Sequence, residues 1–224
     1  MKHLYVIGLP IVISMMVFGG CKKKNQQLAQ SHYKLSMLEL SDDSSSDVRY
    51  KKALDHIDKA LAQDDKPEYL ALKATILFKL NQIEESLFCF KQSLNNDAID
   101  PLLKPEVMNN YACVLAHQGK TEEAVKIWQT LMHDKHYLTP EVALVNQGKV
   151  SIEKGDCAAA RDLFSKAVTI EPSYLDAHYY LALAAFQLQE TDLAKNEVKT
   201  VLFLEPRHTG ALRLGEKLGF IHTT

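Results

Sequence analysis

Side chains that could carry out chemistry are few and scattered in this 224-residue sequence. His133 and His136 lie three positions apart with Asp134 between them, a spacing that can place two imidazoles on one face for a metal ion. They lie in a polar stretch between repeats, where a solvated charge cluster is more common than a metal site. The sequence contains no GxSxG, GxGxxG, HExxH or Walker lysine motif. We therefore predict that the protein is not an enzyme and holds neither a metal nor another cofactor.

Cys21 is the cysteine whose surroundings suggest a modification. A basic start leads into an apolar run from Leu4 to Phe18, and two glycines then precede the cysteine. These are features of an export signal rather than of a spanning helix, and we assign them to residues 1–20. Phe18-Gly19-Gly20-Cys21 resembles a bacterial lipobox, in which the cysteine is acylated and becomes the mature N-terminus. We expect a lipidated, palmitate-bearing Cys21 and a polar tether over 21–25. The alternative is an ordinary signal with Cys21 beside it by accident.

The composition is that of a folded protein. Hydrophobic residues make up 46% of the chain and charged residues 24%, with a formal net charge of −2. No basic run interleaves with aromatic residues, so the sequence lacks the electrostatic footprint of a nucleic-acid binder. The cysteines other than Cys21 are Cys89, Cys113 and Cys157, without CxxC spacing. We interpret them as small buried apolar residues, although an exported location would also permit one disulfide.

One pattern of residue types occurs twice between Pro140 and Pro206. Gly148, Ala160, Phe164, Ala167 and Pro172 recur 34 positions later as Ala182, Ala194, Val198, Val201 and Pro206. A 34-residue period with small residues at the eighth and twentieth sites and a closing proline is the signature of the tetratricopeptide repeat, a helix-turn-helix unit that buries its core by stacking on its neighbours. The predicted fold is an all-α, right-handed solenoid of about five such units and a C-terminal capping helix.

The remaining repeats follow from the same register. We place the units at 26–65, 67–100, 105–138, 141–174 and 175–208, and the capping helix at 209–218, all within one repeat domain over 26–224. The opening unit is degenerate, as expected of a terminal repeat. Gly119 and Gly155 lie where the first helix of a unit must end with a positive φ. Thr121 and Asp156 follow them as predicted helix caps.

In such a stack the first helix of each unit lines a concave surface, so we expect partner binding there. The predicted contact residues are Asn109, Asn110, His117, Asn146, Lys149, Tyr179 and Tyr180. Asn110 and Asn146 share one site in adjacent repeats, which suits a pair of amide hydrogen bonds to a bound segment. The alternative is that both amides satisfy neighbouring helix ends or water. Tyr179 and Tyr180 are an aromatic binding surface or, equally, core packing against the capping helix.

Several stretches resemble one particular family. They are Asn109-Asn110-Tyr111, Gly119, Glu122-Glu123-Ala124, the run from Tyr137 to Gly148, and Gly155-Asp156. Together they are similar to the type IV pilus biogenesis lipoproteins called PilF or PilW. This resemblance implies an outer-membrane lipoprotein of stacked repeats that helps the secretin, the pore for the pilus, to reach or assemble in the outer membrane.

Two functions are consistent with these features. The first is a lipid-anchored adaptor, facing the periplasm from the outer membrane, that binds a secretin or another pilus assembly component and performs no chemistry. The second is a general cell-envelope scaffold that recruits cell-wall enzymes or outer-membrane assembly factors. Both predict protein partners and a membrane anchor, and neither involves nucleic acid.

Overall fold

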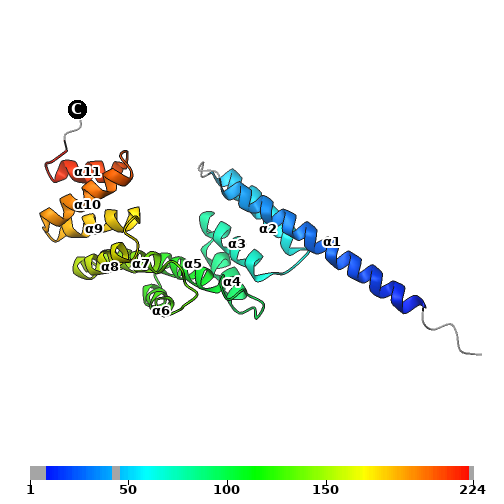
Figure 1. The fold of residues 1–224 in the computed structure, drawn as a ribbon. Coiled ribbons are helices and arrows are strands. Elements are labelled where there is room, and N and C mark those ends of the chain that lie inside the picture. Colours follow the sequence, from blue (N-terminus) through cyan, green and yellow to red (C-terminus); the bar gives the residue numbers. More distant parts are fainter. Residues whose placement is uncertain (1–8, 42–45, 222–224) are drawn as a thin grey trace, which may run out of the picture. The chain divides into compact units, whose positions relative to one another are not determined.

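The computed structural model describes the backbone of residues 9–41 and 46–221, with side chains from Lys23 onward. Over these ranges the chain forms eleven α-helices and no strand, arranged as successive antiparallel pairs (Figure 1). The predicted all-α class is confirmed. The predicted signal peptide lies partly outside the described residues, and the side chain of Cys21 lies outside them altogether.

Five helix pairs are followed by a single last helix. Their bounds are α1 Leu9–Leu40 and α2 Asp47–Leu61, α3 Pro67–Lys79 and α4 Ile83–Leu94, α5 Lys104–His117 and α6 Thr121–Leu131, α7 Pro140–Glu153 and α8 Cys157–Ile170, α9 Leu175–Gln187 and α10 Thr191–Leu204, and α11 Thr209–Lys217. The first helix begins earlier than the repeat pattern at residue 26 predicts, because the apolar run before it also adopts helical backbone. Among the described residues, no helix has the length and apolar character needed to span a bilayer.

The chain divides into two compact units, residues 1–107 and 108–224, with the division inside α5. The single repeat domain expected from the sequence stays a prediction. Each repeat of a solenoid contacts only its neighbours, so a stack of repeats does not need one core along its whole length. The two units are therefore described separately.

The first unit is built on α1 to α4. Its core contains Ala29, Ala53, Ile57, Ala60, Tyr69 and Ile76. Two buried serines lie where helices cross closely and donate their hydroxyls to backbone carbonyls of the facing helix: Ser36 to Ala53 at 2.8 Å and Ser86 to Ala74 at 2.7 Å. A small side chain permits the close approach, and its hydroxyl is satisfied without water.

In the second unit the small-residue sites of the repeat lie at helix crossings, as the 34-residue pattern predicts. The fully buried alanines at these sites are Ala112, Ala124, Ala160, Ala182 and Ala194. Gly148 of α7 lies so close to the ring of Phe164 in α8 that an added Cβ would overlap the ring. Phe164 is itself completely buried, so this crossing has no room for a larger side chain.

The turn inside each complete repeat uses one residue with left-handed backbone. The predicted positive φ is present at Gly119 (85°) and Gly155 (80°). The equivalent site holds Asn81 (60°) in the second repeat and Gln189 (62°) in the fifth. Asparagine tolerates this conformation better than most residues, whereas glutamine adopts it rarely. The repeat geometry therefore dictates the backbone of this site even where glycine is absent.

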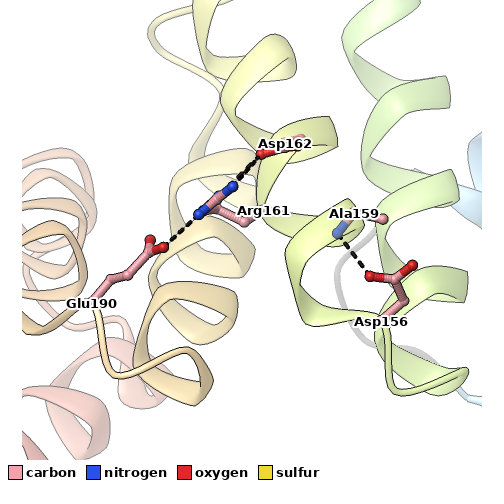
Figure 2. A network of polar contacts seen from close by, with 5 residues as sticks. All are labelled: Asp156, Ala159, Arg161, Asp162 and Glu190. Atoms are coloured by element: carbon pink, nitrogen blue, oxygen red, sulfur yellow. Dashed lines mark hydrogen bonds and ion pairs between the residues drawn. The ribbon is translucent and has the colours of Figure 1, made fainter.

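The caps of α6 and α8 differ. Asp156 accepts a hydrogen bond from the backbone N–H of Ala159 at 2.9 Å, as predicted (Figure 2). The prediction for Thr121 is wrong, because α6 begins at Thr121 itself and its hydroxyl donates to the Glu122 carboxylate. The residue before it, Lys120, has no side-chain acceptor to offer to the free N–H groups of the first turn.

An arginine connects α8 to the start of α10. Arg161 donates to the carboxylates of Asp162, its neighbour on α8, and of Glu190, the residue just before α10 (Figure 2). Both carboxylates raise the pKa of the guanidinium. All three side chains are partly exposed, so solvent screens these pairs and we expect them to orient the arginine rather than to stabilise the fold strongly.

Candidate binding surface

The predicted contact residues all lie on the first helices of three consecutive repeats in the second unit. Asn109, Asn110 and His117 belong to α5, Asn146 and Lys149 to α7, and Tyr179 and Tyr180 to α9. Asn110 and His117 are exposed. For Asn109, Asn146, Lys149, Tyr179 and Tyr180, the contacts described next decide which of their atoms are left for a partner.

A chain of hydrogen bonds joins α6, α5 and α7. The indole N–H of Trp128 donates to Asn109 Oδ1 at 3.0 Å, and Asn146 Nδ2 donates to the same oxygen at 3.2 Å. Asn146 Nδ2 also approaches Cys113 Sγ at 3.3 Å. Since an indole N–H can only donate, it determines which end of the Asn109 amide is the oxygen, and Asn109 in turn determines the orientation of the Asn146 amide.

This arrangement shows what the two amides already contact. The amide nitrogen of Asn146 bonds to Asn109, the neighbour of Asn110, which is the residue at the equivalent site of the preceding repeat. Asn109 is only 5% exposed and its oxygen already accepts two hydrogen bonds, so its role within the protein is to orient Asn146. The binding of a partner by Asn110 and Asn146 stays a prediction.

The oxygen of the Asn146 amide is available to a partner. Its Oδ1 makes no hydrogen bond within the part of the chain that the structure describes, and the side chain is partly exposed. Because the contacts of the amide nitrogen fix the orientation of the whole amide, its oxygen is a pre-positioned acceptor. The group that it suits best is an N–H donor, such as the backbone of a bound peptide.

Lys149 is held between α7 and α9. Its Nζ lies 3.6 Å from Asp176 Oδ2 and 4.4 Å from the centroid of the Tyr180 ring. The ring of Tyr180 in turn stacks on Phe164 with centroids 5.6 Å apart. An ammonium group over an aromatic face is attracted by the ring's quadrupole, so this lysine keeps a defined position while part of its surface faces solvent.

The two tyrosines of α9 have different roles. Tyr179 packs on His208, just before α11, with ring centroids 4.6 Å apart, and it covers Gly210, where an added Cβ would overlap the phenol. Core packing against the capping helix therefore accounts for Tyr179. Tyr180 has one side on the core and the other beneath Lys149, so it keeps a polar neighbour and an exposed edge.

Two residues of this surface are not among the predicted contacts. Tyr174, just before α9, has a pKa of about 12, raised first by burial and then by the negative charges of Asp176 and Glu141. Burial likewise raises the pKa of the Cys113 thiol to about 11. Cys113 occupies one of the groove-facing sites of the repeat, which is a usable signal. Tyr174 lies in the connection between repeats, outside those sites, so the repeat register does not single it out.

We call Cys113, Asn146, Lys149, Tyr174 and Tyr180 the contact strip. It combines an oriented amide oxygen, a held ammonium group, aromatic surface and a neutral thiol across α5, α7 and α9. Such a set can bind a polypeptide by hydrogen bonds and apolar contact. It contains no base beside a nucleophile, and within the described residues no three His, Cys, Asp or Glu side chains are grouped as a metal site requires.

The three cysteines whose side chains the structure describes form no disulfide. Cys89, Cys113 and Cys157 are all free, and Cys89 is buried. Cys157 Sγ donates to Gln187 Oε1 at 2.6 Å, which places it near the end of α9. Their small size and apolar surroundings are consistent with the interpretation of Cys89 and Cys113 as packing residues.

Comparison with known proteins identifies the repeats. The tetratricopeptide repeat model matches residues 67–100 and 151–217. A search of curated proteins gave no match. Among solved structures, Pseudomonas aeruginosa PilF has a TM-score of 0.72 at 19% identity, covering 88% of this chain and 85% of PilF.

Two further structures are similar. PilW, a type IV pilus biogenesis factor, has a TM-score of 0.73 at 21% identity, covering 86% of this chain and 85% of PilW. YrrB, a tetratricopeptide-repeat protein with an unusual peptide-binding site, has a TM-score of 0.57 at 16% identity, covering 89% of this chain and 97% of YrrB. The chain therefore contains tetratricopeptide repeats, and its fold is similar to those of PilF and PilW.

Proposed function

We propose that the protein is a lipid-anchored adaptor in which the contact strip binds a segment of a secretin or of another pilus assembly component. The observation that carries the proposal is the oriented, unpaired oxygen of Asn146 beside the held ammonium group of Lys149. The similarity to PilF and PilW supports the choice of partner class, and the lipobox-like Cys21 supports the anchor.

The strip suits an extended or helical polypeptide better than a small molecule. Asn146 Oδ1 can accept from a backbone N–H, while Lys149 can bind a carbonyl or carboxylate of the same segment. The Tyr174 hydroxyl stays neutral over the physiological pH range because its pKa is about 12, so it remains a hydrogen-bond donor. Because the amide and the ammonium group are already positioned, little side-chain entropy is lost when a partner binds.

A capture experiment with envelope extract tests the strip. The immobilised protein should retain a secretin or pilus component, and Asn146→Ala combined with Lys149→Glu should reduce its recovery at least tenfold, which corresponds to about 1.4 kcal/mol. Lys154→Glu is the matched control, since Lys154 pairs with Glu122 on an exposed surface away from the strip. Capture that survives the double substitution would refute the role of the strip. Capture of cell-wall enzymes instead would favour the general scaffold.

The anchor is tested separately by Cys21→Ser. Acyl chains contribute about 0.8 kcal/mol per buried CH₂, and more than one chain is needed for stable anchoring. We expect the substituted protein to leave the outer-membrane fraction. If it stays there after a salt wash, the lipid is not what holds the protein at the membrane.

A further inference from the structure

A second concave feature lies in the same unit, between the second helices of two adjacent repeats. It is an open cleft of about 430 Å³ bounded by α6 and α8, with α7 beneath. Met132, Leu144 and Ile170 give it an apolar floor, and Gln147, His133 and Lys166 contribute polar groups. This volume lies within the usual range of sites for small ligands, which is about 300–1,000 Å³.

The cleft is separate from the contact strip. Successive residues of an α-helix lie about 100° apart around its axis. Asn146 and Lys149 therefore share one face of α7, whereas Leu144 and Gln147 share a nearly opposite one. A ligand in the cleft would contact none of the strip residues, so the two sites can be changed independently.

Gln147 is the residue that makes the cleft a candidate site. Its side chain is only 7% exposed, yet it makes no hydrogen bond within the part of the chain that the structure describes. The next repeat has Leu181 at the same site, buried in the core. The amide of Gln147 is not among the fully buried, unpaired side-chain groups of the described residues, so it reaches the opening of the cleft, where it can exchange hydrogen bonds with a ligand and leucine could not.

The charge around the cleft indicates which ligand fits. Lys166 and His133 are exposed at its edge, and no carboxylate lines it. Lys166 makes no ion pair within the described ranges. The edge therefore offers positive charge above an apolar floor, which complements an acidic group attached to an aliphatic one.

We propose that this cleft binds a short peptide segment carrying an aliphatic residue next to an acidic one. The aliphatic side chain packs on Met132, Leu144 and Ile170. The peptide group between the two residues exchanges hydrogen bonds with the Gln147 amide, which can both donate and accept. Lys166 and His133 then face the carboxylate. The site is additional to the proposed adaptor function and does not depend on it.

The probe is N-acetyl-leucyl-glutamyl amide, with N-acetyl-leucyl-glutaminyl amide as the uncharged control, titrated into the full-length protein and followed by NMR; both C-termini are amidated, so the two peptides differ in charge only at the side chain. At about 10 mM, within the range expected for so small a fragment, the acidic peptide should shift the side-chain N–H signals of Gln147. The uncharged peptide should bind at least threefold more weakly. Unmoved Gln147 signals, or equal binding of both peptides, would overturn the proposal.

Substitutions provide the second readout. Gln147→Leu should weaken binding at least threefold while leaving Tm unchanged or raising it, because the amide makes no hydrogen bond within the described residues and the next repeat accommodates Leu181 at the same site. Lys166→Glu should abolish the preference for the acidic peptide, whereas Lys199→Glu on α10 should preserve it. A lowered Tm for Gln147→Leu would show that the amide is structural, and equal effects of the two lysine substitutions would show a non-specific charge effect. Either result would refute the site.

Discussion

Replacing Asn109 by alanine removes the central acceptor of the hydrogen-bond chain between Trp128 and Asn146. The indole N–H then has no acceptor, and Trp128 is only 1% exposed, so water cannot easily replace the amide. Asn146 loses one of its two partners and keeps Cys113 Sγ. The substitution therefore acts on the fold through a buried, unsatisfied donor.

The magnitude follows from that donor. Leaving a buried donor unsatisfied costs about 1–3 kcal/mol, whereas an ordinary internal hydrogen bond contributes about 0.5–1.5 kcal/mol net. Asn109→Ala should thus cost about 2–3 kcal/mol and Asn146→Ala about half as much, since Asn109 still accepts from Trp128 in the latter. For a chain of this length, each 1 kcal/mol lowers Tm by roughly 2–4 °C. We expect a loss of about 4–12 °C for Asn109→Ala.

Trp128 is the protein's single tryptophan, so its fluorescence reports directly on this site. Thermal and urea unfolding should be followed by tryptophan emission and by circular dichroism. Asn110→Ala is the matched control, because Asn110 is exposed on the same helix and its loss should change stability by less than about 0.5 kcal/mol. Trp128→Phe combined with Asn109→Ala should cost less than the sum of the single substitutions, because donor and acceptor leave together.

Two results would refute this reasoning. If Asn109→Ala and Asn110→Ala melted at the same temperature, the amide of Asn109 would not be a structural group. If the double substitution at Trp128 and Asn109 were strictly additive, the two side chains would not be coupled, and the orientation inferred for Asn146 would have no basis.

The remaining predictions concern packing, pH and a buried histidine. Gly148→Val should cost at least about 1–3 kcal/mol by overlapping the Phe164 ring, and an unchanged melt would mean that α7 and α8 are not so close. The Cys113 thiol has a folded pKa of about 11 against an ordinary 9.0, so the folded state holds this proton more tightly and stability should fall between about pH 9 and 11. In urea titrations at several pH values, Cys113→Ala should reduce this loss of unfolding free energy with rising pH. An identical pH dependence in the variant and the wild type would contradict the prediction. Both ring nitrogens of His178 face acceptors, one of which is the Glu197 carboxylate. His178→Leu should therefore lower the free energy of unfolding by about 1–3 kcal/mol. An unchanged free energy of unfolding would show that neither contact stabilises the fold.

The repeat architecture was predictable because its determinants are local. A small residue at a helix crossing and a glycine at a positive φ are each required by the geometry of one unit, so they recur at fixed intervals. Ala160 and Gly155 show this directly, since the structure places one at a closed crossing and the other at the left-handed turn. The early start of α1 was not predictable in the same way, because it lies before the repeat pattern begins.

The hydrogen-bond partners within the site were not predictable from the register. The repeat register places Asn146 and Asn110, 36 residues earlier, at equivalent sites and gives no partner for either amide, whereas the structure joins Asn146 to Asn109. Trp128 on another helix determines the orientation of the Asn109 amide, because its indole N–H donates a hydrogen bond to the Asn109 oxygen. A sequence pattern records which sites face a neighbour but not which of two adjacent amides a third side chain will engage.

The two amides on α7 differ in how they are prepared for binding. Asn146 is held by Asn109 and Cys113, so a partner that binds its oxygen meets a side chain that is already ordered. Gln147 has no such support within the described residues, and ordering a side chain of this kind on binding costs about 0.5–1.5 kcal/mol. For hydrogen bonds of equal quality, the cleft should therefore bind more weakly per contact than the contact strip. This difference favours a lasting partner on the strip and a readily exchanged segment in the cleft.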